Sequence, residues 1–196
     1  MITVPCTAAE ALKRARDVAY QGGQYLLGTG DYWPHSEGGS FVDLPWTSKA
    51  GVWGSDCAGF AICYAWKLTR HRPGFNKGTW ATVSDDINSD SALQDARYKQ
   101  ELFVEVTAPR PGDLLIYPSI YIKGKRFIGH VGLVESVPAV WTVGEYNKLG
   151  ILQCHGPNGF RPGVVRSDGS TWTKHDVVWP KEAHRSALVR PKERIS

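Results

Sequence analysis

The chain has 196 residues, of which 42% are hydrophobic, and a formal net charge of +4. This length suits a single domain with a sizeable core, and the sequence contains neither an internal repeat nor a low-complexity tract. No run of about 18 apolar residues is present, which excludes a membrane-spanning helix. The Lys and Arg residues are interrupted by Pro, Gly and acidic residues and form no recognised module, which argues against nucleic-acid binding.

The first predicted element is a helix over residues 7 to 21. Thr7 and Glu10 have the spacing of a capping box, and Gly22 and Gly23 end the pattern. Small and aliphatic residues recur on one face with helical spacing, namely Ala11, Leu12, Ala15, Val18 and Ala19. Residues 28 to 54 are rich in Gly, Trp, Pro and Ser, and we expect a long loop there.

A second helix is predicted to begin at Cys57. Ser55 and Asp56 are candidate N-caps, and the apolar residues that follow, Phe60, Ala61, Tyr64, Ala65 and Leu68, share one helix face. Unpaired backbone amides and the positive end of the helix dipole collect in the first turn, where they can lower the pKa of a cysteine below its free value of about 8.5. Cys57 is therefore a candidate nucleophile. We assign Asp56 to capping backbone amides, because a carboxylate beside the sulfur would disfavour the thiolate.

The second half of the chain favours strands. Residues 71 to 100 are polar and mixed, with a short helix expected near residues 91 to 102, and strands dominate after that. This order along the chain, with helices first and antiparallel strands after them, is typical of an α+β fold. Residues 161 to 196 contain eight Lys or Arg and four Asp or Glu, a difference of 8 − 4 = +4. We expect one domain over residues 1 to 196 whose part from about residue 156 is basic, and we interpret this charge as a solvated surface.

Two histidines are placed to assist a cysteine nucleophile. His130 lies in a strand-like run over residues 127 to 135, where it shares a face with Gly132 and Val134. His155 ends a second run over residues 150 to 155. Neighbouring strands could present both rings to one helix terminus, the first as the base and the second orienting it through its other nitrogen.

These motifs resemble the NlpC-like cell-wall endopeptidases, which are papain-related cysteine hydrolases. Residues 56 to 60 are similar to the nucleophile motif of that family, with Ala58 in place of the more usual serine. Residues 111 to 117 and 129 to 134 resemble the turn and the strand around the base, and His155 falls where the third polar residue is expected. Residues 23 to 28 resemble the segment that places a tyrosine, here Tyr25, beside the cysteine.

The resemblance implies a papain-like α+β fold, with the nucleophile at a helix N-terminus packed on an antiparallel sheet. It implies catalysis by Cys57, His130 and His155, with Tyr25 helping to bind the oxyanion, and no cofactor. His130 and His155 are 155 − 130 = 25 residues apart, which is longer than usual for the family, and we interpret residues 136 to 149 as a loop extension.

The remaining cysteines do not indicate a metal or disulfide framework. No CxxC pair or Cys and His cluster has zinc-ligand spacing. Two disulfides would consume Cys57, so we interpret Cys63 and Cys154 as packing residues and leave Cys6 unassigned. Trp33, Trp46 and Trp53 precede the nucleophile, and we favour packing over sugar binding for them.

The implied function is hydrolysis of an amide in the peptide stem of bacterial peptidoglycan, with the bond between D-glutamate and the diamino acid as the first candidate. An N-acetylmuramoyl-L-alanine amidase, another amide hydrolase or acyltransferase, and a non-catalytic cell-wall-binding or virion component remain alternatives. A monomer is the default. Residues 1 to 7 lack the basic start and apolar core of a secretory signal. We therefore expect a soluble protein that reaches the wall by a non-classical route, such as phage lysis, a virion tail or injection.

Overall fold

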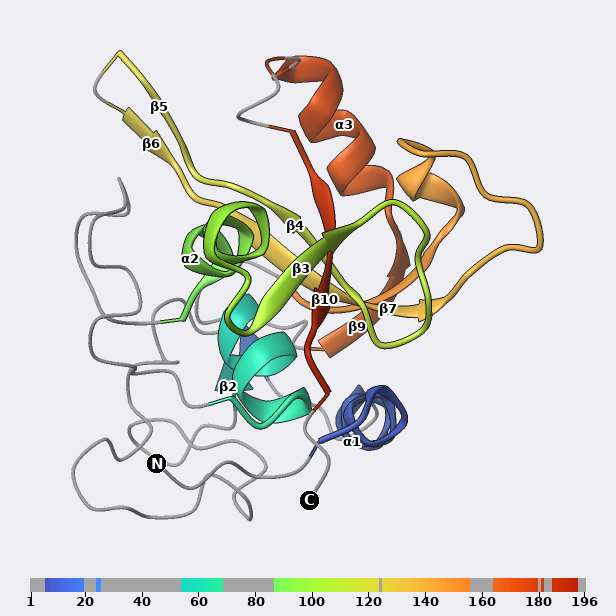
Figure 1. Cartoon of the computed structure of the whole chain (residues 1–196). Helices are drawn as coiled ribbons and strands as arrows, with labels where there is room; N and C mark the ends of the chain where they lie inside the picture. Colours follow the sequence, from blue (N-terminus) through green and yellow to red (C-terminus); the bar gives the residue numbers. More distant parts are fainter. Residues whose placement is uncertain are drawn as a thin grey trace, which may run out of the picture.

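The structure is a computed structural model that describes residues 6–19, 24–25, 54–68, 87–123, 125–155, 164–179, 181 and 185–193. Its centre is a six-stranded sheet in the order β3-β10-β4-β7-β8-β9, in which every neighbouring pair is antiparallel (Figure 1). The strands are β3 (Phe103–Val106), β4 (Leu114–Tyr117), β7 (His130–Ser136), β8 (Gly150–Cys154), β9 (Val164–Asp168) and β10 (Ala187–Pro191). Helices accompany this sheet, so the predicted α+β class is confirmed.

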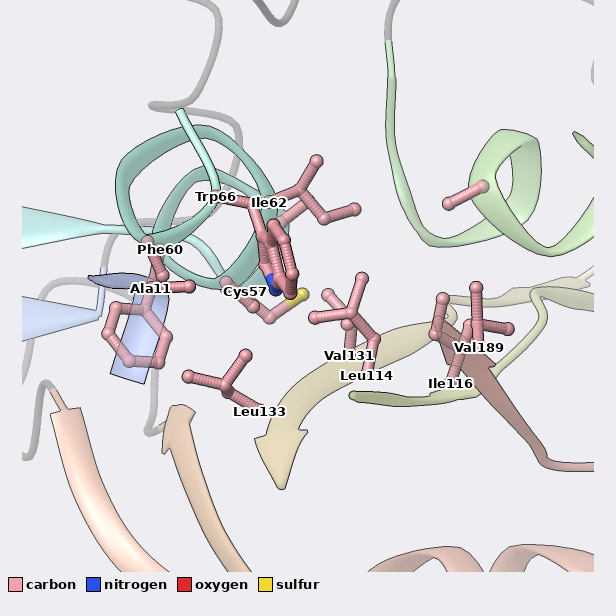
Figure 2. Packing of buried hydrophobic residues seen from close by; sticks show 14 of the residues in the cluster. Ala11, Cys57, Phe60, Ile62, Trp66, Leu114, Ile116, Val131, Leu133 and Val189 are labelled. Carbon is pink, nitrogen blue, oxygen red and sulfur yellow. The ribbon is translucent and has the colours of Figure 1, made fainter. Parts of the chain in front are cut away.

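Alternation along the strands gives the sheet two buried faces. Leu114 and Ile116 of β4 pack in the core that contains the helix bearing Cys57, whereas Leu115 packs in a second core around Trp172. The first face is covered by α1 (Ala8–Ala19), the π-helical segment η3 (Gly59–Ala65) and α2 (Ser89–Gln94). Figure 2 shows this helix layer against the strands. The second face is covered by α3 (Ser170–Val178) and the short 3-10 segment η5 (Tyr146–Lys148).

The amino-terminal helix forms as its pattern predicts. Glu10 Oε2 accepts a hydrogen bond from the Thr7 backbone N–H at 2.8 Å, and Thr7 Oγ1 accepts one from the Glu10 N–H at 3.3 Å. This is the reciprocal capping box. The helix ends at Ala19, and its buried residues, Ala11, Leu12, Ala15 and Val18, belong to the predicted stripe.

Helical structure elsewhere differs from the sequence prediction. The helix expected near residues 91 to 102 begins earlier, at Ser89, and continues as a second π-helical segment, η4 (Asp95–Lys99). The Asp95 carboxylate accepts hydrogen bonds from the backbone N–H groups of residues 101, 102 and 103, which stops the helix and starts β3. α3 was not predicted, because Trp172 is the buried residue of this helix and the pattern therefore lacks an apolar stripe.

Two small pairs of strands complete the described elements. β5 (Ile120–Ile122) and β6 (Lys125–Phe127) form an antiparallel hairpin between β4 and β7. β1 (Gln24–Tyr25) and β2 (Gly54–Ser55) are parallel. The loop predicted for residues 28 to 54 lies outside the described residues except for Gly54. No helix in the described part of the chain is long and apolar enough to cross a membrane.

The extension predicted between the two histidine-bearing strands is a loop that folds back onto the second sheet face. Trp141 Nε1 donates a hydrogen bond to the Thr107 carbonyl at 3.0 Å, and Tyr146 donates its hydroxyl hydrogen to the Ser186 carbonyl at 2.9 Å. The extension is therefore joined to residues that adjoin β3 and β10. It contributes to the core around Trp172.

A buried carboxylate ties the end of the described chain to the β4 turn. Asp113 is 1% exposed, and its two oxygens accept hydrogen bonds from Arg190 at 2.8 and 2.9 Å and from the Arg110 backbone N–H at 2.8 Å. The hydrogen bond to the Arg110 N–H closes the turn before β4. The ion pair adds a contact between β10 and the start of β4.

We expect Asp113→Ala to lower the free energy of unfolding by about 2 kcal/mol, because it leaves the Arg190 guanidinium and a turn amide without their acceptor. Urea unfolding monitored by circular dichroism measures this. Asp17→Ala is the matched control, since Asp17 forms an exposed ion pair with Lys13 and its loss should cost less than about 0.5 kcal/mol. Equal losses in the two variants would contradict the structural role of Asp113.

Candidate active site

Cys57 lies in the first turn of the helical stretch that continues as η3. Asp56 Oδ1 accepts a hydrogen bond from the Gly59 N–H at 2.6 Å, which confirms the predicted capping role of Asp56. Cys57 is 7% exposed, and Figure 2 shows its sulfur directed from the helix toward the sheet. The sulfur is thus buried where helix amides favour a negative charge.

The backbone of Tyr25 lies beside the strand that leads into the nucleophile. β1 and β2 pair so that Tyr25 is opposite Ser55, two residues before Cys57. The side chain of Tyr25 lies outside the described part of the structure. Trp33, Trp46 and Trp53 also lie outside the described residues.

His130 is the first residue of β7 and is 4% exposed. Its ring lies among aromatic neighbours, with ring centroids 5.8 Å from Tyr117, 5.3 Å from Trp172 and 5.6 Å from His155. Gly132 provides the space for this cluster, because a Cβ atom there would lie 2.9 Å from the Trp172 ring. A side chain at position 132 would therefore displace the Trp172 ring that lies beside His130.

The residue that hydrogen bonds to the His130 ring is Gln153. Its Oε1 lies 2.7 Å from His130 Nε2, and its own Nε2 donates to Ser167 Oγ at 2.7 Å. An amide oxygen can only accept, so this arrangement places the ring proton on Nε2 and leaves the Nδ1 lone pair available. Gln153 was not among the site residues predicted from the sequence. The available signal was the period-two pattern of β8, which places Gln153 on the same face as His155.

His155 follows β8 and is exposed, and its ring is nearly perpendicular to that of His130, with an interplanar angle of 71°. The structure therefore brings His130, Gln153 and His155 together. Cys57 belongs to the core that includes Val131, the residue after His130.

Electrostatic interactions connect the nucleophile turn with the histidine cluster. Burial lowers the pKa of His130 to about 4, against the opposing effects of its hydrogen bond to Gln153 and the Asp56 carboxylate, while His155 lowers it further. Burial, and then the charge of Cys57, raise the pKa of Tyr117 to about 12. At neutral pH the His130 imidazole is therefore uncharged and able to accept a proton.

The four cysteines all lie in the part of the chain that the structure describes. Cys6, Cys57, Cys63 and Cys154 are all buried, and none of them is in a disulfide. Cys63 and Cys154 are 1% and 0% exposed, as packing residues should be. The described residues contain no group of three or more His, Cys, Asp or Glu side chains that could hold a metal ion.

Comparison with known families gives one match. The model of the CHAP domain matches residues 46–147, a segment that contains Cys57 and His130 and ends before Gln153 and His155. Comparisons with curated proteins and with solved structures find no significant match.

The buried neutral His130 should make stability depend on pH. Its pKa is about 4 in the folded protein and about 6.5 in an unfolded chain. The unfolded state therefore binds more protons between these values, and the free energy of unfolding should fall as the pH drops through this window, by up to about 3 kcal/mol. Urea unfolding at pH 7, 6, 5 and 4.5 measures this. In His130→Gln the fall should be smaller, and an identical fall in both proteins would contradict the assignment.

Proposed function

Because the chain belongs to the CHAP domain family of papain-like cysteine- and histidine-dependent amidohydrolases and peptidases, we propose that Cys57 is its nucleophile and His130 its general base. The protein is a hydrolase, and its family supports activity on peptidoglycan. The observation that carries the assignment is the electrostatic link between the two groups. The Asp56 carboxylate, next to Cys57, acts on the buried, uncharged His130, and the charge of Cys57 acts on Tyr117, whose ring centroid lies 5.8 Å from that of His130.

In the proposed mechanism, His130 Nδ1 accepts the thiol proton and Cys57 attacks the carbonyl carbon of an amide. The backbone N–H of Cys57, with Tyr25, stabilises the oxyanion, which the location of Cys57 in a helix first turn supports. His130 then donates its proton to the leaving amine, and a thioester to Cys57 remains. Water attacks the thioester with the same imidazole as base, which releases the acid and restores the thiol.

Gln153 is proposed to orient the base. The ring proton on His130 Nε2 is held by the amide oxygen, and Ser167 holds the amide in turn. The amide dipole stabilises the imidazolium that forms during the reaction without adding a full negative charge. The family resemblance gives this role to His155, which stays a prediction. The exposed ring of His155 instead borders the solvent side of the His130 cluster.

The substrate bond is proposed to be an amide of the peptide stem. The resemblance to NlpC-like enzymes favours the bond between D-glutamate and the diamino acid. The match to a family of amidohydrolases supports a second candidate, the bond between muramic acid and L-alanine. Both reactions use the same nucleophile and base, and they differ in which carbonyl Cys57 attacks.

Digestion of purified peptidoglycan tests the function. We expect the wild type to release fragments and Cys57→Ala to release none, because alanine has no nucleophile. Mass spectrometry of the new fragment ends identifies the bond. Cys63→Ala is the matched control, since Cys63 is a buried thiol of the same helical segment, and it should retain activity.

Other outcomes favour the alternatives. If the wild type cuts nothing while Cys57 reacts rapidly with iodoacetamide near neutral pH, an acyltransferase or another amide substrate becomes the better assignment. If it cuts nothing and the thiol is inert, a binding or structural role is supported.

Variants at residues 153 and 155 separate the two candidates for orienting the base. Gln153→Leu should lower kcat by about 100-fold with a smaller change in KM, because the imidazole loses its partner. Gln153→Glu should restore much of the activity and move the acidic limb of the pH profile upward, since a carboxylate raises the pKa of His130. His155→Ala should lower kcat by less than about tenfold. The reverse order, with His155→Ala the more damaging change, would assign the orienting role to His155.

A further inference from the structure

The β5–β6 hairpin is a direct continuation of the strands that carry the base. Tyr117 at the end of β4 is opposite His130 at the start of β7, and after a short irregular stretch Ile120 is opposite Phe127 in the hairpin. Figure 1 shows the hairpin projecting beyond the six-stranded sheet, on the side toward which α3 also rises. The end of the hairpin that joins β4 and β7 therefore lies at the candidate active site.

A row of rings from α3 supports the hairpin. Trp172 and His175, three residues apart, share one face of the helix, and Trp179, four residues further on, follows its last turn. Their ring centroids lie 5.3 Å from His130, 4.2 Å from Tyr117 and 5.6 Å from Phe127, in that order. The base and the hairpin thus both contact rings that belong to α3 or follow it directly.

The supported side of the hairpin combines apolar surface with positive charge. Phe127 is 41% exposed, and the Lys125 ammonium lies 5.6 Å from its ring centroid. Strand alternation places both side chains on the face of the hairpin that Trp179 contacts. Exposed apolar residues that adjoin an active site, with cations beside them, fit a ligand with an apolar body and a carboxylate.

The direction of proton transfer determines which part of the substrate lies next to this hairpin. His130 delivers its proton to the departing amine, so the leaving group lies on the side of the base and not on the side of Cys57. For both candidate bonds, the leaving amine carries the rest of the stem peptide, which ends in a carboxylate. The leaving peptide therefore lies on the side of the site that bears the hairpin, and its terminal carboxylate is complementary to the positive charge there.

We propose that Lys125, Phe127 and Trp179 form the subsite that binds the leaving peptide, with the Lys125 ammonium paired to its terminal carboxylate. This inference rests on the proposed function. Lys125 is already held over the Phe127 ring, so less side-chain freedom is lost when the carboxylate binds.

The test compares two soluble muramoyl pentapeptides, one with a free terminal carboxylate and one with a terminal amide. Lys125→Ala should lower kcat/KM about fivefold on the free peptide and leave it unchanged on the amide. Phe127→Ala should lower kcat/KM on both peptides. Two variants are matched controls and should leave kcat/KM unchanged on both peptides. Lys13→Ala removes an exposed lysine of α1, and Tyr121→Ala removes an exposed ring on the opposite face of the hairpin.

A second readout separates binding from damage to the site. The rate of Cys57 alkylation by iodoacetamide should be the same in the wild type and Lys125→Ala, because a small reagent does not use the subsite. The proposal is overturned if Lys125→Ala lowers kcat/KM equally on both peptides or leaves kcat/KM unchanged on both. It is also overturned if the rate of Cys57 alkylation falls in parallel with kcat/KM. A wild type that digests cell walls but neither peptide also overturns it, since the leaving peptide would not be what the enzyme holds. A wild type that cleaves neither peptides nor walls overturns the proposed function as well.

Discussion

Strand β7 is buried on both faces, and the candidate active site depends on this constraint. Val131 and Leu133 pack in the core of the nucleophile helix, so His130 and Val134 must face α3. A polar ring in such a strand requires a hydrogen-bond partner, because an unpaired buried group is costly. Gln153 on the adjacent strand supplies that partner. The same packing that buries the imidazole also keeps it uncharged and fixes the direction of its two nitrogens.

The surroundings of the base come from the part of the chain that follows the family match. The matched segment, residues 46–147, contains both proposed reacting groups. Gln153, Ser167 and Trp172, which hold or cover His130, belong to β8, β9 and α3. The proposed nucleophile and base thus lie in the matched segment, whereas Gln153 and Ser167, which hold the imidazole, and Trp172, which covers it, lie outside it.

The elements with strong local signals could be predicted from the sequence. The capping box of α1, the helix start at Cys57 and the strand of His130 all follow from spacing and turn chemistry. α3 could not be predicted this way, because it buries a single tryptophan and its position is set by contacts with β4 and β7. Gln153 was overlooked because an amide in a strand carries no signal of its own. Its role depends on the register between β7 and β8, which only the fold supplies.

The place of β10 in the sheet has a consequence for how the enzyme is made. This strand, Ala187–Pro191, lies between β3 and β4 and is the neighbour that both of them share. A ribosome releases the nucleophile helix and the base strand long before it releases β10, and such non-local pairings form late. During synthesis the chain therefore carries the proposed nucleophile and base on an unfinished sheet. The sheet around the two proposed residues is complete only when β10 inserts, so that their synthesis and the completion of the sheet are separated in time within a single chain.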